Sequence, residues 1–268
     1  MKFGRGGSVN KLSGEPDASR LGNPSFVWRF GQWRRLQKIQ SYVDIPGAQI
    51  LDLGCGVGEY VRAMSDLNGN CIGIDLEIKR LNVAQNREEG SDRDNGRSVD
   101  FVAAASERLP LKADRFDLVL LNEVIEHVDD DFLTLNEVAR VLRIGGHCVL
   151  FAPNRGYPFE THGIWWRGKY IFGNIPFVNW FPTRLRNRLV PHARVYGHRG
   201  FENLVDKRLF EIVEHTYVFP GFDNIFVRSR LIGRLLRKLC YSLEATYFKR
   251  LGISHLLVLR RIDRKDAL

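Results

Sequence analysis

The residues with the clearest chemical potential lie in one short stretch, residues 49–60, which reads QILDLGCGVGEY. An apolar run carries an acid, Asp52, and glycines 54, 56 and 58 then alternate with other residues before helix-compatible sequence begins. This order predicts a strand, a tight glycine loop and a helix. Glycines let a ligand lie directly against the backbone at the N-terminus of the following helix. We therefore expect this loop to bind a nucleotide-containing ligand.

Two familiar nucleotide-binding loops fit this stretch poorly. A dinucleotide loop has the pattern G-x-G-x-x-G, and its third glycine packs the helix against the strand. Here the loop reads G-x-G-x-G, and Glu59 occupies the position of that third glycine. A large charged side chain does not suit that position. No G-x-x-x-x-G-K-[ST] pattern occurs in the sequence, which excludes a phosphate-cradling P-loop.

Alternating strand and helix patterns surround the loop. Apolar runs predict strands at residues 50–53, 71–76, 99–103, 116–121, 147–152, 209–219 and 254–262. Amphipathic segments predict helices at residues 25–42, 60–67, 79–88, 131–142, 199–207 and 228–249. Near-continuous apolar strands separated by helices imply a mainly parallel sheet with helices on both faces. The expected fold class is α/β, a doubly wound, Rossmann-like sheet of seven strands.

The regular pattern is interrupted at both ends and in one long insertion. Residues 1–24 are rich in Gly, Ser, Asn and Pro, which predicts a disordered arm before a domain at residues 25–268. Residues 91–97 read as a charged loop. Residues 153–198 carry many aromatic residues, prolines and arginines and read as a loop-rich insertion. Because loops of this length inside a compact domain are usually functional, we expect a lid over the site.

Composition limits the class of protein and its partners. The 268 residues suffice for one large domain, and a hydrophobic content of 44% is that of a soluble globular protein. The 4 cysteines have no CxxC spacing, and Cys55, Cys71 and Cys148 read as buried free thiols, which suits a reducing cytosol. No signal peptide is visible, and Arg167 and Lys169 interrupt the best apolar run. We expect a cytoplasmic protein whose net charge of +9 attracts phospholipid, nucleic acid or a phosphorylated substrate.

A series of motifs resembles the class I S-adenosylmethionine-dependent methyltransferases, with the quinone-biosynthesis type nearest. The series covers residues 48–152 and, more weakly, residues 199–262. Its parts are the loop 52–58, Asp75 at the end of the second strand, residues 107–117 (ERLPLKADRFD), residues 122–128 (NEVIEHV) and residues 140–146 (RVLRIGG). One glycine motif alone would be weak support, whereas an ordered series of this kind is strong.

The resemblance implies S-adenosylmethionine as the cofactor and assigns residues to it. Asp75 would accept hydrogen bonds from both ribose hydroxyls, and Gly54 and Gly56 would admit the amino-acid end of the cofactor. Asp52 would act through hydrogen bonds near the cofactor's ammonium, although a helix cap or a surface charge is the alternative for both acids. The family often has an adenine-binding acid where this chain has Ala105, so Ser106 or Glu107 would substitute. Further implied cofactor contacts are Cys55, Gly58, Leu76 and Asn122.

The resemblance also suggests how the chemistry is done. His127 follows the fourth strand, at the methyl end of the cofactor, and is the candidate catalytic base; the alternative is that it only packs the next helix. Glu123, Glu126 and His127 are spaced like part of the metal site of small-RNA 2′-O-methyltransferases, which His192 or its rival His198 would complete. Such a site would suit Mg²⁺, Mn²⁺ or Zn²⁺. The same motif occurs in relatives that bind no metal, so a site without metal is the alternative.

The insertion would select the methyl acceptor. Tyr157, Glu160 and His162 are expected to contact it. Residues 165–188 and the helix 228–249 resemble surfaces that lie on anionic lipid; the alternatives are an ordinary hydrophobic lid packed on the domain and a helix packed on the sheet edge with its arginines in solvent. We expect O- or C-methylation of a small-molecule or lipid- or glycan-linked acceptor, with no obligate protein partner. A metal-assisted RNA 2′-O-methyltransferase is one alternative, although no RNA-binding module is recognisable. A non-catalytic adaptor that keeps the fold is the other.

Overall fold

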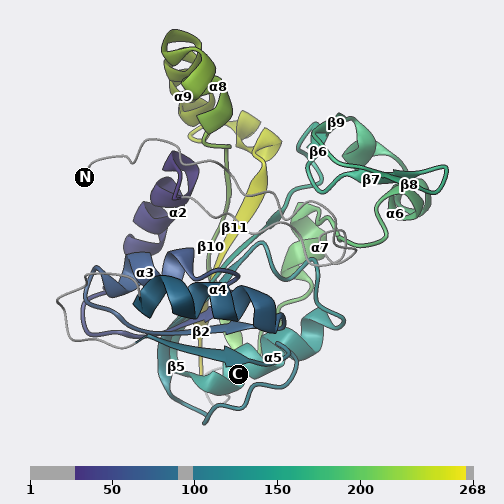
Figure 1. Ribbon diagram of the computed structural model, residues 1–268. Helices are drawn as coiled ribbons and strands as arrows, with labels where there is room; N and C mark the ends of the chain where they lie inside the picture. The colour runs from purple at the N-terminus through teal and green to yellow at the C-terminus, as the bar shows by residue number, and fades with distance from the viewer. Residues whose placement is uncertain (1–27, 90–98, 264–268) are drawn as a thin grey trace.

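The computed structural model describes residues 28–89 and 99–263 (Figure 1). The arm predicted at residues 1–24, the first residues of the helix predicted at 25–42 and the charged loop predicted at 91–97 lie outside the described residues. The elements that position the site belong to one large sheet and the helices that cover it.

The sheet has seven strands in the order β10-β11-β5-β4-β1-β2-β3. Strand β11 runs antiparallel to both of its neighbours, and the remaining pairings are parallel. The predicted α/β class with a mainly parallel, doubly wound sheet is confirmed. The strands are β1 (Gln49–Leu53), β2 (Asn70–Asp75), β3 (Asp100–Ala103), β4 (Phe116–Asn122), β5 (Leu142–Pro153), β10 (Phe210–Val218) and β11 (Ser254–Arg261).

Helices cover the two faces of this sheet with separate apolar cores (Figure 1). Helices α2 (Phe30–Gln40), α3 (Glu59–Ser65) and α4 (Ile78–Glu89) pack on one face, and α5 (Asp131–Val141) and α7 (His198–Glu202) pack on the other. In β4, Phe116, Val119 and Leu121 enter the α5 side, whereas Leu118 and Leu120 enter the α2 side. All five side chains are fully buried, which explains the continuous apolar run in the sequence.

The insertion is more regular than the loop-rich segment predicted at residues 153–198. It contains two small antiparallel sheets and two short helices, and in Figure 1 it forms a lobe beside the large sheet. Val178, Leu189, Val190 and Ala193 give the lobe a small core of its own, which is why it can hold regular structure. Its elements are β6 (Phe159–Glu160), β7 (Ile164–Trp166), β8 (Lys169–Ile171), β9 (Ile175–Pro176), η1 (Val178–Trp180) and α6 (Thr183–Leu189).

The helix predicted at residues 228–249 is shorter in the structure, because the chain divides this region among three elements. These are α8 (Asp223–Arg228), α9 (Arg230–Leu243) and the 3-10 helix η2 (Tyr247–Leu251). Ser229 separates α8 from α9, because its side chain caps α9 by accepting a hydrogen bond from the backbone N–H of Ile232. Thr246 caps η2 in the same way. Helices α8 and α9 project away from the large sheet in Figure 1.

Two other predicted boundaries also differ from the structure. The helix predicted at residues 199–207 ends at Glu202, and Asp206 then closes a turn by accepting the backbone N–H of Arg208 at 2.9 Å. Strand β5 begins at Leu142 rather than residue 147, with Gly145 at a φ of 81° inside an irregular start. The predicted burial of Cys55, Cys71 and Cys148 is confirmed, and none of the three forms a disulfide within the part of the chain that the structure describes. Within the described residues, no helix has both the length and the apolar character needed to span a bilayer.

Candidate active site

A cavity of about 530 Å³ lies at the carboxyl edge of the sheet. Its lining includes the glycine loop after β1, Asn122 and Glu123 at the end of β4, and Ser254 at the start of the antiparallel strand β11. Helix α2, the insertion and the segment before α8 complete its walls. Open α/β sheets bind ligands at this edge, so the topology places the predicted loop where a ligand would enter.

The glycine loop has a backbone shape that requires its glycines. Gly54, Gly56 and Gly58 have φ values of 76°, 56° and 76°, in the left-handed region that residues with a Cβ rarely adopt. The backbone N–H groups of Gly54 and Cys55 donate to the carbonyl of Ile74 at 2.7 and 2.8 Å. These bonds hold the loop across the end of β2 and bring it next to Asp75.

Asp75 lies between the glycine loop and the start of the next helix. Its Oδ2 accepts the backbone N–H of Gly56 at 2.8 Å, and its Oδ1 accepts that of Glu77 at 2.9 Å. Each carboxylate oxygen can accept a second hydrogen bond, so Asp75 remains able to bind a diol. It lines a neighbouring cavity of about 210 Å³ together with Leu76, Ser106 and Glu107. The structure therefore brings the predicted ribose and adenine residues together.

Glu107 already forms hydrogen bonds within the protein. Its Oε1 accepts the backbone N–H groups of Asp129 and Asp130 at 2.9 and 3.2 Å, and its Oε2 accepts the hydroxyl of Ser106 at 3.2 Å. These bonds tie the loop after β3 to the loop before α5. Glu107 thus shapes the adenine side of the cavity and offers only the remaining lone pairs to a ligand.

Asp52 is a buried acid that faces the larger cavity. Its exposure is only 2%, and within residues 28–89 and 99–263 its carboxylate accepts no hydrogen bond. Burial, together with the nearby negative charge of Asp75, raises the pKa of Asp52 to about 8. A buried carboxylate of this kind is stabilised in its charged form by a cation. The ammonium group of S-adenosylmethionine fits this requirement.

Arg35 enters the same cavity from α2 and was not singled out by its sequence. Its guanidinium donates to Asn122 Oδ1 at 2.5 Å, to Glu123 Oε1 at 2.7 Å and to Ser254 Oγ at 2.8 Å. Burial would raise the pKa of Glu123, but the charge of Arg35 and the hydrogen bond from Ser254 outweigh it and lower that pKa. The only hint in the sequence is that Arg35 belongs to a basic, aromatic amphipathic segment, and its direction depends on how α2 packs.

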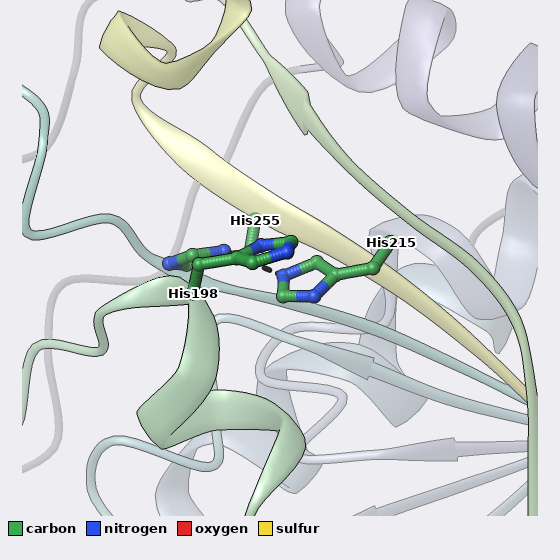
Figure 2. A group of neighbouring side chains, drawn as sticks. All are labelled: His198, His215 and His255. Carbon is green, nitrogen blue, oxygen red and sulfur yellow. Dashed lines mark hydrogen bonds between the residues drawn. The ribbon is translucent and has the colours of Figure 1, made fainter.

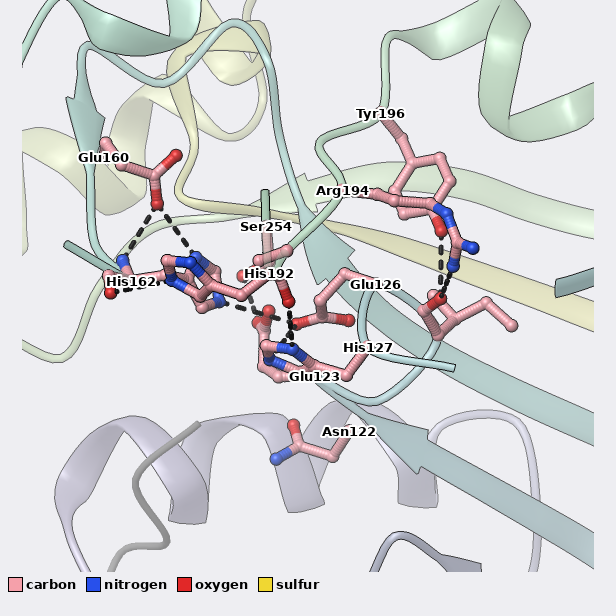
Figure 3. Close-up of polar contacts among 12 residues, drawn as sticks. Asn122, Glu123, Glu126, His127, Glu160, His162, His192, Arg194, Tyr196 and Ser254 are labelled. Atoms are coloured by element: carbon pink, nitrogen blue, oxygen red, sulfur yellow. Dashed lines mark hydrogen bonds and ion pairs between the residues drawn. The ribbon is translucent and has the colours of Figure 1, made fainter. Parts of the chain in front are cut away.

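Glu126, His127 and His162 form a second polar cluster at the cavity (Figure 3). The side chain of Glu126 is fully buried, and neither of its carboxylate oxygens has a hydrogen-bond partner. Its Oε1 lies 3.7 Å from His162 Nε2 and 4.0 Å from His127 Nε2. Burial, above all, raises the pKa of Glu126 to about 7. A buried carboxylate without a hydrogen bond is stabilised by a proton or a cation nearby, and His162 or a metal ion in its place can supply that charge.

The hydrogen bonds of the two histidines fix which ring nitrogen faces the cluster. His127 Nδ1 donates to the carbonyl of His192 at 3.0 Å, so Nε2 carries the lone pair of the neutral ring. Burial and the charge of His162 lower the pKa of His127 to about 4. His162 Nδ1 donates to Glu160 Oε1 at 2.9 Å. Burial alone would lower the pKa of His162, but the nearby Glu126 and Glu160 carboxylates outweigh it and raise that pKa to about 10.

This donor set fits a divalent cation. Two ligand atoms that each lie about 2.0–2.1 Å from one ion are about 3–4 Å apart, and the Glu126–histidine distances fall in that range. Histidine ligands usually donate their second ring N–H to a carboxylate or a backbone carbonyl. His162 does so to Glu160 and His127 does so to the carbonyl of His192. Two imidazoles and a carboxylate suit Zn²⁺ or Mn²⁺.

The structure does not gather all of the residues that the sequence suggested. His162 lines the cavity, whereas Tyr157 and Glu160 are not among its described lining residues. Glu160 is 1% exposed and instead binds the buried guanidinium of Arg186 at 2.8 Å. His192 also lines the cavity, but its Nε2 donates to the carbonyl of His162 at 3.2 Å rather than reaching Glu126. His198 belongs to a different cluster.

Comparisons with known proteins concern the family and the fold of this chain. Residues 51–150 match the family model described as a methyltransferase domain. A ubiquinone biosynthesis O-methyltransferase of Bartonella tribocorum is 26% identical over 196 residues, which is 71% of either chain. The Sinorhizobium medicae protein of the same name is 32% identical over 175 residues, 65% of this chain and 64% of the relative. The chain thus spans less than two thirds of that relative, and only 53% of the Bartonella bacilliformis protein.

Solved structures share the fold at lower sequence identity. An S-adenosylmethionine-dependent methyltransferase from Mesorhizobium loti has a TM-score of 0.57 and 20% identity, over 86% of this chain and 98% of that one. The [4+2]-cyclase SpnF has a TM-score of 0.54 and 17% identity, over 86% and 81%. Likeness at this level concerns the fold alone.

The sheet order and the loop after β1 define the class I, Rossmann-like methyltransferase fold. Within that class, the chain carries an S-adenosylmethionine-dependent methyltransferase domain, with distant homology to the ubiquinone biosynthesis O-methyltransferases.

Proposed function

We propose that this protein transfers the methyl group of S-adenosylmethionine to an oxygen or carbon atom of a hydrophobic, lipid-linked acceptor at an anionic membrane surface. The observation that carries this proposal is the position of α9. The segment Phe219, Pro220, Gly221 and Asp223 lines the cavity, and Asp223 begins α8, which leads directly into α9. A surface suited to lipid therefore continues from the wall of the reaction cavity.

Helix α9 has an apolar stripe that the described residues leave uncovered. Leu231, Leu235 and Leu239 are spaced four residues apart and are 77%, 66% and 56% exposed. Arg230, Arg234 and Lys238 form a parallel exposed stripe beside them. Leucines flanked by basic residues favour insertion at the interface of anionic lipid. In the insertion, Trp165, Trp166 and Phe172 are also exposed, and aromatic side chains favour the same interface.

Five polar residues at the site have proposed roles. Asp75 and Asp52 would hold the ribose and the ammonium of the cofactor, which leaves the methyl group facing the end of β4. The neutral Nε2 of His127 would accept the proton that an acceptor hydroxyl or enolised carbon loses. Most of the rate would come from holding the nucleophile, methyl carbon and sulfur in line. Where Glu126, His127 and His162 hold a divalent cation, His127 Nε2 would be one of its ligands, and the ion would supply acidification of a bound acceptor hydroxyl in place of the free base.

Vesicle flotation of the full-length protein tests the membrane part of this proposal. We expect binding to vesicles that contain an anionic phospholipid and little binding to purely zwitterionic vesicles. The triple variant Leu231→Ser, Leu235→Ser and Leu239→Ser should lose at least about tenfold in binding, because it removes several kcal/mol of apolar transfer free energy. The matched control replaces Ile144 and Val213, which are 57% and 42% exposed elsewhere, with Ser. Equal binding by the triple variant and the control would refute the membrane surface.

The catalytic part requires an acceptor, so its test uses extracts. Lipid and aqueous extracts would be incubated with the protein and S-adenosylmethionine labelled at the methyl group. We expect label to enter the lipid fraction with wild type and to fall at least about 100-fold with His127→Ala, since general-base catalysis is worth about 10²–10⁴. Incorporation of the label into RNA instead would contradict a lipid-linked acceptor and would identify RNA as the acceptor.

A further inference from the structure

Three histidines meet on the far side of the sheet from α2, outside the reaction cavity (Figure 2). His198 is the first residue of α7, His215 lies in β10 and His255 lies in β11. One nitrogen of each ring lies within 4.8 Å of a nitrogen of both others. None of them lines the larger cavity, and the proposed methyl transfer does not use them.

The strand register explains why two of these rings meet. Tyr217 pairs directly with His255, and His215 is two residues from Tyr217, so all three side chains point to the same sheet face. His215 is 4% exposed at its side chain and His255 is fully buried. Helix α7 covers this face and brings His198 onto the ring of His215, with ring centres 4.0 Å apart.

Hydrogen bonds assign the outer nitrogen of each buried ring as a donor. His255 Nε2 lies 2.8 Å from the carbonyl oxygen of Tyr196, which can only accept. His215 Nδ1 lies 2.9 Å from Glu202 Oε1, an ionised carboxylate oxygen that also only accepts. Each neutral ring has a single N–H, and these two contacts use both. The inner nitrogens, His215 Nε2 and His255 Nδ1, then carry lone pairs.

Those two lone-pair nitrogens face each other at 2.9 Å. Two facing lone pairs repel unless a positive species lies between or beside them. A proton would make one ring a buried imidazolium, and a metal ion would take both nitrogens as ligands with a small separation of the rings. The outer contacts, one to a carboxylate and one to a backbone carbonyl, are those that orient metal-bound histidines.

We propose that His198, His215 and His255 form a site for a transition metal ion, with Zn²⁺ as the expected occupant. Three imidazoles match the ligand preference of Zn²⁺, and a fourth position remains for water. In the structure His198 stacks on His215 at an interplanar angle of 19°, so its ring must turn to direct a nitrogen at the ion. Its side chain is 39% exposed at the start of α7, and the rotation would break the 3.1 Å contact between its Nδ1 and the Tyr217 hydroxyl.

The proposed ion would fasten the end of the insertion to the large sheet. Tyr196, whose carbonyl holds His255, also receives the backbone N–H of Arg155 at 2.9 Å, and residue 155 lies at the start of the insertion. Helix α7 directly follows the insertion in the chain. A metal bound by α7, β10 and β11 would therefore fix both ends of the lobe, a structural role that is independent of the methyl-transfer chemistry.

The test measures metal binding by the full-length protein after it has been stripped with a chelator. Zn²⁺ would be titrated against a competing indicator, and Co²⁺ would report a low-coordinate nitrogen site through its visible absorption bands. Both would be measured in a Glu126→Gln background, which removes the carboxylate of the cluster in the reaction cavity. We expect one Zn²⁺ per chain and Co²⁺ bands in that background.

Matched variants separate this site from other histidines. His198→Ala should weaken Zn²⁺ binding at least about tenfold and abolish the Co²⁺ bands, and its exposed position makes loss of the fold a lesser concern. Glu202→Gln, which alters the carboxylate beside His215 (2.9 Å) and His198 (3.6 Å) without removing a histidine, should weaken binding about 10–100-fold. His147→Ala, a half-buried histidine in β5, serves as the control and should bind metal like the background. Absence of Zn²⁺ binding in the background protein, or equal binding by His198→Ala and the control, would overturn the proposal. A proton between His215 Nε2 and His255 Nδ1 would then account for their close approach.

Discussion

Replacing Asp52 with Asn should remove a pH dependence from cofactor binding that the wild-type protein displays. In the ligand-free protein, burial and the charge of Asp75 raise the pKa of Asp52 to about 8. The ammonium of S-adenosylmethionine would pair with the ionised form, which lowers that pKa in the complex. Binding below pH 8 must therefore release a proton from Asp52, so affinity rises with pH.

The size of this effect follows from the pKa. About 1% of the Asp52 side chains are ionised at pH 6 and about half at pH 8, so the affinity should rise roughly fiftyfold between them. That rise corresponds to about 2.3 kcal/mol of binding free energy. Above about pH 8 the rise should end and then reverse, because the α-amino group of the cofactor loses its own proton there.

Calorimetric titration in two buffers of different ionisation enthalpy measures both the affinity and the protons released. The control is Asp117→Asn, which changes a buried acid in β4 that binds the backbone N–H of Gln49, away from the cavity. The control should keep the pH dependence, and Asp52→Asn should bind weakly with little change across this range. A flat wild-type affinity between pH 6 and 8, or the same rise in Asp52→Asn, would refute the assignment of Asp52.

Two further predictions concern the insertion and the cluster around Glu126. Glu160→Gln should destabilise the lobe by about 3–5 kcal/mol, because it leaves the buried charge of Arg186 without its partner at 2.8 Å. Faster hydrogen exchange in residues 159–193 would reveal this, whereas Glu211→Gln, in an exposed pair with Arg260, should leave exchange unchanged. Removing divalent cations should slow methylation by wild type but not by His162→Ala, and equal slowing of both proteins would contradict a cation at this cluster.

The fold could be predicted because its signals are local. Each central strand is an apolar run that must be buried on both faces, as β4 shows, and such runs can be found without knowing their neighbours. The sequence signals for the cofactor-binding part of the site are equally local. The glycine loop and Asp75 lie at the ends of adjacent strands, and their types alone limit what can bind there.

The reaction side could be predicted only in part, because distant segments build it. The motif at residues 122–128 supplied Glu126 and His127, but nothing in the spacing reveals which later histidine returns to them. His162 does so because Glu160 and Arg186 anchor the lobe through a buried ion pair. Arg35 reaches Glu123 across 88 residues of sequence, through the packing of α2 on the sheet.

The helix boundaries show a further limit of sequence patterns. Leucines recur every four residues from 231 to 243 and favour one helix over residues 228–249, yet Ser229 and Thr246 both cap new elements. Their hydroxyls compete with helix continuation by bonding backbone N–H groups locally. Periodicity alone does not weigh that competition.

The central claim is that the cavity beside the glycine loop binds S-adenosylmethionine through Asp75, and equilibrium titration of the cofactor into the full-length protein tests it most directly. Saturable binding at one site per chain is predicted, with Asp75→Ala weakened at least about 100-fold. That loss follows from two hydrogen bonds to a charged group, each worth about 1.5–3 kcal/mol. Circular dichroism should verify that the variant is folded. No saturable binding by wild type, or equal affinity of wild type and a folded Asp75→Ala variant, would contradict the claim.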